Sequence, residues 1–351
     1  MSNGLGRPLR RVGARLILVM LGLAVFGACA TGRTEVAYDP GAPRSAPVAR
    51  ADPFPYAARP VTFSNHVLLE EETADYIARF LTFPSMGRNG LPGDVLNARY
   101  YQRKAAGQQS LVIVLPIWGG HPYPQAIVAA DLRRARLGHV MLVDGDSAII
   151  DWDALAAAPT GPVFADTMRE MVNRVRTSVV DIRRMMDWAE QRPEVDARRS
   201  GLVGFSESTL QLGGVVASDP RPTAAVFVMG GAHPHRVLAT CYGPPADVRR
   251  EILPRFGWSV SGYTAVLDHL MAPMDVARLG SRIDPARVLL VEAAHDDCIP
   301  EDARDALWRI LGYPTRISVH AGHAGSFLAM TPLGGNHVRI SISRFLARVL
   351  G

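Results

Sequence analysis

The sequence predicts an α/β fold in which a mostly parallel central sheet is covered by helices on both faces. Two observations predict it. Short apolar runs of strand length alternate with longer amphipathic segments along most of the chain, and several runs are apolar throughout, as in parallel strands buried on both faces. The alternation breaks at about residues 231–284, where Pro, Trp, Met and His are mixed. We interpret this stretch as a helical cap inserted over the edge of the sheet.

The first half of the regular region contains three predicted strands and two predicted helices. Val95–Gln102 alternates between polar and apolar residues, as a half-exposed strand would, whereas Leu111–Leu115 and His139–Asp144 are almost wholly apolar. Amphipathic segments predict helices over Tyr123–Leu137 and Asp166–Gln191.

The second half continues the alternation on both sides of the cap. Ser200–Phe205 predicts a strand, followed at once by a helix over Glu207–Ala217 and an apolar strand over Thr223–Met229. After the cap, strands are predicted over Arg287–Ala293 and Thr315–His320, and helices over Pro300–Leu311 and Asn336–Leu350. Ligands on such sheets bind at the carboxyl ends of the parallel strands, so the loops after these strands are where a site is expected.

The N-terminus has the three parts of an export signal. Basic residues precede the apolar run Leu16–Phe26, and small residues then lead to Cys29, as in bacterial lipoprotein signals. We therefore predict a signal peptide over residues 1–29, a flexible Pro- and Ala-rich linker over 30–60, and a domain over 61–351. The protein would be exported to the cell envelope and anchored to a membrane by a lipid on Cys29, facing the periplasm or the exterior. Simple secretion or an uncleaved anchor are the alternatives.

Charge and cysteine content narrow the function classes. The formal net charge of +5 includes four arginines of the predicted signal, and no basic stripe interleaved with aromatic residues follows, so we expect no nucleic-acid partner. The histidines and cysteines show no metal-binding spacing, so we expect no metal. Cys241 and Cys298 could pair in an exported protein, but their sequence contexts lead us to predict that they are separate.

The strand-to-helix junction at Ser206 has the spacing of a nucleophilic serine. Gly204-Phe205-Ser206-Glu207-Ser208 matches G-x-S-x-G except at its last position. A sharp turn there would lift the serine hydroxyl above the sheet edge. The alternative is that Ser206 or Ser208 simply caps the following helix.

A base and an acid follow in the chain order that this architecture requires. His323 lies in a Gly-flanked loop after the last predicted strand, and Asp296 and Asp297 follow the strand before it. We predict His323 as the base and Asp296 as the acid. Asp297 is the other candidate for the acid, but we expect it to cap the helix that follows. Backbone N–H groups of Glu207 and of Ile117 or Trp118 are the predicted oxyanion donors.

With these residues, the chain resembles α/β-hydrolase fold serine hydrolases over about Val95–Gly351. The loops Pro116-Ile117-Trp118-Gly119, His295–Pro300 and Gly322–Phe327 are similar to those of dienelactone-hydrolase-like and esterase or lipase branches. The resemblance implies a carboxylic ester hydrolase that acts on a small ester through an acyl-enzyme and needs no cofactor. Ser208 departs from the glycine of the family's pattern.

Three other functions use the same residues differently. A peptidase or an acyltransferase would share the triad and differ in the leaving group or the acceptor. A non-catalytic surface lipoprotein would retain the fold as a binding scaffold, and Ser208 is the residue that favours this alternative.

Overall fold

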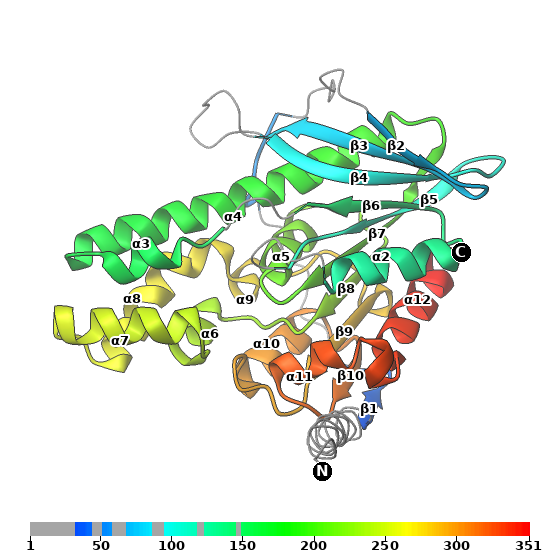
Figure 1. Cartoon of the computed structure of the whole chain (residues 1–351). Helices are drawn as coiled ribbons and strands as arrows, with labels where there is room; N and C mark the ends of the chain where they lie inside the picture. The colour runs from blue at the N-terminus through cyan, green and yellow to red at the C-terminus, as the bar shows by residue number, and fades with distance from the viewer. Residues whose placement is uncertain (1–31, 44–50, 58–67, 86–94, 118–122, 145–148) are drawn as a thin grey trace, which may run out of the picture.

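The computed structural model of the chain describes residues 32–43, 51–57, 68–85, 95–117, 123–144 and 149–351 (Figure 1). Within these residues the strands form one ten-stranded sheet in the order β1-β10-β9-β8-β7-β5-β6-β4-β3-β2. The block from β10 to β6 is parallel, and antiparallel pairs extend it at both ends. The predicted α/β class with a mostly parallel sheet is confirmed.

The strands alternate with helices as the hydrophobic pattern indicates. The strands are β1 Arg33–Val36, β2 Leu68–Glu72, β3 Tyr76–Pro84, β4 Val95–Arg103, β5 Gln109–Val114, β6 His139–Val143, β7 Val195–Phe205, β8 Ala224–Val228, β9 Val288–Ala293 and β10 Thr315–Val319. The helices are α2 Gln125–Arg134, α3 Trp152–Ala157, α4 Gly161–Glu190, α5 Ser208–Ser218, α6 Pro234–Thr240, α7 Pro244–Phe256, α8 Val260–Met271, α9 Val276–Leu279, α10 Glu301–Ile310, α11 His323–Leu328 and α12 His337–Leu350.

Helices cover both faces of the sheet, and each face has its own apolar core. On one face, Met186 of α4, Leu212 of α5 and Leu307 of α10 pack against the central strands. On the other face, Leu132 of α2 and Leu346 of α12 do the same. Residues of β6, β8 and β9 are buried throughout, which is why these strands are almost wholly apolar in the sequence, with His139 in β6 and Glu292 in β9 as the exceptions.

A third apolar core lies beyond the sheet edge, where α3 and the start of α4 lie beside α6, α7 and α8 (Figure 1). Phe164 of α4, Ile252 of α7 and Leu267 of α8 are all fully buried in it. The stretch predicted as a cap thus holds α6 to α9, but α3 and the first turns of α4 share its core. The sequence did not indicate that α3 and α4 take part in the cap. α4 is one unbroken helix that begins at Gly161, with Thr160 as its cap residue, and its sequence does not mark where it leaves the sheet and enters the cap core.

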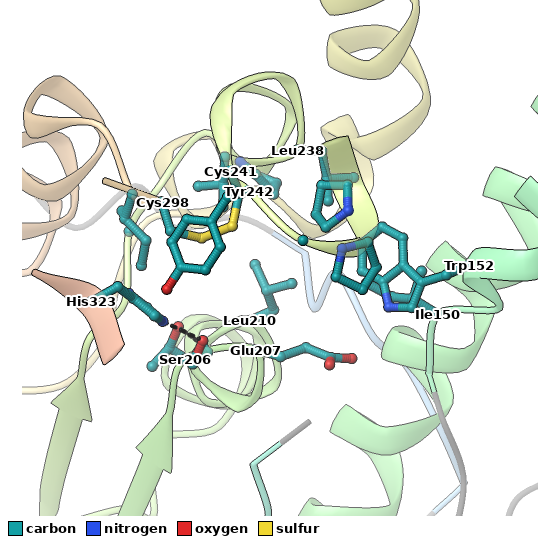
Figure 2. A pocket seen from close by; sticks show the side chains of 18 of the residues that line it. Ile150, Trp152, Ser206, Glu207, Leu210, Leu238, Cys241, Tyr242, Cys298 and His323 are labelled. Carbon is teal, nitrogen blue, oxygen red and sulfur yellow. Dashed lines mark hydrogen bonds between the residues drawn. A yellow bond between two sulfur atoms is a disulfide. The ribbon is translucent and has the colours of Figure 1, made fainter. Parts of the chain in front are cut away.

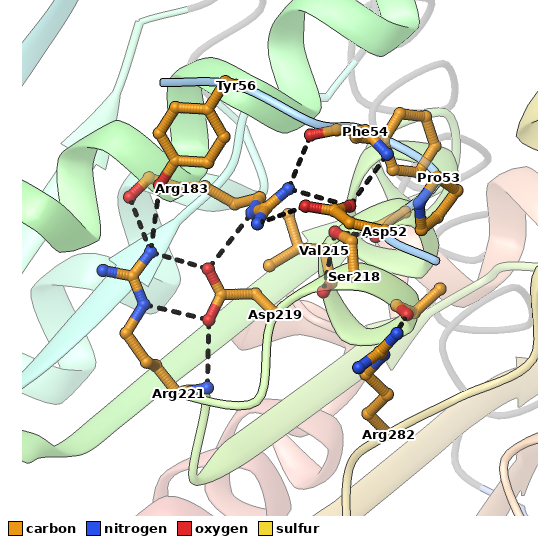
Figure 3. A network of polar contacts seen from close by, with 12 residues as sticks. Asp52, Pro53, Phe54, Tyr56, Arg183, Val215, Ser218, Asp219, Arg221 and Arg282 are labelled. Atoms are coloured by element: carbon orange, nitrogen blue, oxygen red, sulfur yellow. Dashed lines mark hydrogen bonds and ion pairs between the residues drawn. The ribbon is translucent and has the colours of Figure 1, made fainter. Parts of the chain in front are cut away.

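Two segments within the predicted linker are parts of the folded domain. β1 pairs antiparallel with β10 at the sheet edge. Further along, Phe54 is only 2% exposed, and Arg183 of α4 pairs with Asp52 at 2.9 Å and donates to the carbonyl of Phe54 at 2.7 Å (Figure 3). A flexible tether over 30–60 therefore does not describe these two segments. The Pro- and Ala-rich composition of residues 30–60 predicted a linker, because composition alone cannot show that Asp52 and Phe54 contact Arg183 of α4.

The same network continues through two further charges. Asp219, 3% exposed, accepts from both Arg183 and Arg221 (Figure 3). Arg221 also pairs with Asp187 at 2.7 Å. Burial alone would raise the pKa of Asp219, but the hydrogen bonds and charge of Arg221 outweigh burial and lower it. Each buried charge in this network therefore has an opposite charge beside it.

The predicted signal and Cys29 lie outside the described residues. Among the residues that the structure does describe, no helix has the length and apolar character needed to span a membrane.

Candidate active site

Ser206 occupies the sharp turn between β7 and α5. Its φ is +49°, a left-handed conformation that is uncommon for a residue other than glycine and that concentrates at functional sites. The turn is tight on its inner side, because a Cβ on Gly204 would lie 3.1 Å from the carbonyl oxygen of Ser208. The strand-to-helix turn predicted at this position is therefore present.

Ser208, the departure from the sequence pattern, is part of this turn. It is 2% exposed, and its Oγ accepts from the N–H of Phe205 at 2.7 Å and donates to the carbonyl of Phe205 at 3.1 Å. A serine is accommodated here because its hydroxyl finds both a donor and an acceptor at the end of β7.

The structure brings Ser206, His323 and Asp296 together in one hydrogen-bonded series. Ser206 Oγ lies 3.1 Å from His323 Nε2, and His323 Nδ1 lies 2.8 Å from Asp296 Oδ2 (Figure 2 shows the first of these contacts). The Asp296 side chain is fully buried and that of His323 is 11% exposed. His323 is the first residue of α11 and its ring meets Phe327 edge-on.

The two candidate acids have different positions. Oδ1 of Asp296 accepts from the N–H groups of Cys298 and Ile299 at 2.9 and 2.7 Å, which fixes the carboxylate while Oδ2 faces the imidazole. Asp297 instead accepts from the backbone N–H of His323 at 3.4 Å. The prediction that Asp297 caps the following helix is wrong, because α10 begins after Pro300 without a hydrogen bond from any capping side chain.

Cys241 and Cys298 form a disulfide, so the prediction that they are separate is wrong. Cys241 ends α6 of the cap and Cys298 lies in the loop that carries Asp296. The two segments are 57 residues apart in sequence and meet at the wall of the same cavity. The pairing was inaccessible from the sequence because it depends on how the cap folds back.

A cavity of about 230 Å³ opens beside Ser206 and His323. Its far end is formed by Ile150 and Trp152, which precede or begin α3, and its roof by Leu238, the disulfide and Tyr242 (Figure 2). Figure 2 shows the Tyr242 hydroxyl directed toward the Ser206–His323 pair. Burial and then the charges of Asp297 and Asp296 raise the pKa of Tyr242. Tyr242 and Trp152 were not among the predicted site residues, because residues of the cap and of α3 have no fixed spacing along the chain from Ser206, Asp296 and His323.

Two of the three residues predicted to donate to the oxyanion, Glu207 and Ile117, lie among the described residues. Glu207 directly follows Ser206, and its N–H makes no hydrogen bond with the described residues. Ile117 follows β5, the strand beside β7, and is half-buried. Trp118 lies outside the described residues.

One group of side chains among the described residues is close enough to hold a metal ion. It comprises His233, His235 and Asp275, whose ligand atoms lie within 4.8 Å of one another at the base of the cap. Asp275 already has hydrogen-bond partners in this group. Its Oδ1 accepts from the backbone N–H groups of His233 and Ala277, and its Oδ2 lies 3.1 Å from Nδ1 of His233. None of the three belongs to the Ser206–His323–Asp296 series.

Comparisons with known proteins agree on the fold. No family model matches the chain, and no curated protein matches it. Among solved structures, an acetyl xylan esterase from Paenibacillus sp. R4 matches with a TM-score of 0.60 at 18% identity, over 83% of this chain and 90% of that one.

Two further structures give similar values. Acetyl xylan esterase 1 from Thermoanaerobacterium sp. JW/SL YS485 matches with a TM-score of 0.53 at 17% identity, over 83% of this chain and 87% of that one. A cold-adapted esterase from an Arctic intertidal metagenomic library matches at 0.52 and 16% identity, over 83% of this chain and all of that one. The chain thus has the α/β-hydrolase fold.

Proposed function

We propose that this protein hydrolyses carboxylic esters with Ser206 as nucleophile, His323 as general base and Asp296 as the residue that orients the base. The observation that carries the proposal is the unbroken series from Ser206 Oγ through both nitrogens of His323 to a fixed, buried carboxylate. Hydrogen bonding, rather than mere proximity, is what a serine needs to lose its proton as it attacks.

The steps follow from the geometry. His323 Nε2 takes the proton of Ser206 as Oγ attacks the ester carbonyl, and the N–H of Glu207, which has no partner among the described residues, donates to the oxygen that becomes negative. Asp296 keeps the other ring nitrogen protonated and stabilises the imidazolium. The protonated His323 then donates to the leaving alcohol, which leaves an acyl group on Ser206. Water, activated by the same base, releases the acid and restores the enzyme.

The cavity supports a small substrate. A volume of about 230 Å³ is below the usual range for drug-sized ligands and fits the reacting end of a short ester. Three of the similar structures are named esterases, two of them acetyl xylan esterases. We therefore place short-chain acyl esters first among the substrates.

Turnover of a matched substrate panel tests the proposal. We expect the wild type to hydrolyse p-nitrophenyl acetate and butyrate, and His323→Ala to lose about 10³-fold or more in kcat. His320→Ala is the matched control, because exposed His320 follows the strand before the same loop and does not contact Ser206. Equal rates for His323→Ala and the wild type would overturn the proposal, and turnover of peptide amides in place of esters would favour a peptidase.

We also propose that the protein is exported and lipid-anchored through Cys29. The basic and apolar N-terminal pattern supports export, and so does the disulfide, since disulfides persist in oxidising compartments. Incorporation of radiolabelled palmitate by the wild type but not by Cys29→Ser is the expected result. Equal labelling of both would contradict the anchor.

A further inference from the structure

The side chain of Glu207 projects into the candidate active site, next to the nucleophile. Its backbone lies at the start of α5, one residue after Ser206, and it contributes to the wall of the cavity. Figure 2 shows its carboxyl group extending away from the Ser206–His323 pair, toward Trp152 and Ile150 at the far end. The proposed mechanism uses only the N–H of this residue, so the carboxyl group is unexplained.

The carboxyl group has no protein partner among the described residues. Oε1 is shielded from solvent and makes no hydrogen bond. The residue as a whole is half-buried because part of its surface lines the cavity. Burial alone raises the pKa of Glu207 to about 7, with no neighbouring charge or hydrogen bond contributing.

Other buried carboxylates in the described part of the chain have hydrogen-bond partners. Glu292, 3% exposed, accepts from Arg316 and Ser318 at 2.6 Å each. Asp219 and Asp296 likewise accept several hydrogen bonds. Leaving a buried acceptor unpaired is unfavourable, because the group has lost its hydrogen bonds to water and gained none in return. Glu207 differs from these residues in facing a cavity that a ligand can enter.

We propose that Glu207 determines specificity by accepting a hydrogen bond from the substrate, and that the preferred substrates are small esters with one hydrogen-bond donor, a hydroxyl or an amino group, on an otherwise apolar body. This rests on the proposed ester hydrolysis. The cavity is lined mainly by apolar side chains such as Leu210 and Leu238, which fit the body of the substrate. An ester with only hydrocarbon substituents would cover the Glu207 carboxyl group and leave it without a hydrogen bond. An ester that carries a hydroxyl or amino group could donate a hydrogen bond to this carboxyl group.

Matched esters measure this preference on both sides of the scissile bond. The acyl series is p-nitrophenyl hexanoate and its counterparts with a terminal hydroxyl or amino group. The alcohol series is hexyl acetate and its terminal hydroxyl and amino counterparts. The readout is the ratio of kcat/KM for each donor-bearing ester to that for its parent, which cancels any general loss of activity in a variant.

In the wild type we expect a ratio of about tenfold or more in at least one series. A ratio of this size corresponds to the free energy of one hydrogen bond to a charged group. Glu207→Leu should bring this ratio close to one, and Glu207→Gln should retain part of the hydroxyl preference while losing the amino preference. Leu210→Ala is the matched control, a lining residue without a polar side-chain atom, and should leave the ratio unchanged.

The two proposals fail in different ways. Parent and donor esters hydrolysed at equal kcat/KM by the wild type, or a ratio unaffected by Glu207→Leu, would overturn the role of Glu207 alone. Absence of hydrolysis of every ester by the wild type would overturn ester hydrolysis and the role of Glu207 with it.

Discussion

The backbone N–H of Cys298 donates a hydrogen bond to Oδ1 of Asp296 at 2.9 Å. The sulfur of the same residue is bonded to Cys241 at the end of α6. The disulfide therefore fixes the cap and the loop of the candidate acid to each other, at the wall of the cavity.

Removing this disulfide should affect stability and activity together. For Cys241→Ala with Cys298→Ala we expect a loss of about 2–4 kcal/mol in the free energy of unfolding, because the bond closes a loop of 57 residues. We also expect a lower kcat, because the loop that holds Asp296 loses its tie to the cap. Urea denaturation and ester kinetics measure the two effects. A reductant should cause the same losses of stability and of kcat in the wild type and should have no effect on the double variant. A double variant with the urea midpoint and the kcat of the wild type would refute this account.

The two neighbouring aspartates provide a matched pair for the acid. Asp296→Asn should lower kcat by about 10³–10⁴-fold, because the amide can no longer hold the imidazole in its reactive tautomer. Asp297→Asn should cost less than about tenfold, since Asp297 contacts only the backbone N–H of His323. If the larger loss came from Asp297→Asn, the roles of the two residues would be reversed.

Much of this arrangement could be predicted from the sequence. Apolar runs that end in glycine or polar loops located the central strands, and the order of Ser206, Asp296 and His323 along the chain indicated the residues that the structure brings together. These features are local, or depend only on the shared edge of parallel strands.

The parts that the sequence did not predict depend on distant contacts. The disulfide, the place of α3 in the cap core and the burial of Phe54 each require segments far apart in the chain to meet. The carboxyl group of Glu207 is a similar case. The sequence assigned a role only to its backbone N–H, whereas the structure buries Oε1 and places the residue in the wall of a cavity that distant segments form.

Ser208 should stabilise the turn rather than impair it. Ser208→Ala would leave the buried N–H and carbonyl of Phe205 without the serine hydroxyl, so we expect a loss of about 1–3 kcal/mol in the free energy of unfolding. Ser218→Ala is the control, because its buried hydroxyl only donates to carbonyls within α5, and should cost less than about 1 kcal/mol. Urea denaturation compares them. Equal losses would show that the Ser208 hydroxyl has no special role.

Glu207 should make stability depend on pH. Its pKa is raised from 4.5 to about 7 in the folded state, so the folded protein binds the proton more tightly than the unfolded chain does. Stability should then fall as pH rises from about 4.5 to 7, by on the order of 3 kcal/mol, and stay level above that range.

Replacing the carboxyl group should remove this component. The free energy of unfolding of Glu207→Gln should lack this fall with pH. The difference between the variant and the wild type should therefore shift in favour of the variant from about pH 5 to about pH 8, as measured by urea denaturation at both pH values. Glu35→Gln, at an exposed position of β1, should follow the wild type. A pH dependence shared by Glu207→Gln and the wild type would contradict the burial of the ionisable group.

Covalent labelling of Ser206 tests the central claim most directly. Purified protein lacking residues 1–29 would be treated with a fluorophosphonate probe, alongside Ser206→Ala, and the modified peptide identified by mass spectrometry. Because His323 Nε2 lies 3.1 Å from Ser206 Oγ, we predict one label per wild-type molecule, located on Ser206, and none on Ser206→Ala. An unlabelled wild type, or equal labelling of the two proteins, would contradict the assignment of Ser206 as an activated nucleophile.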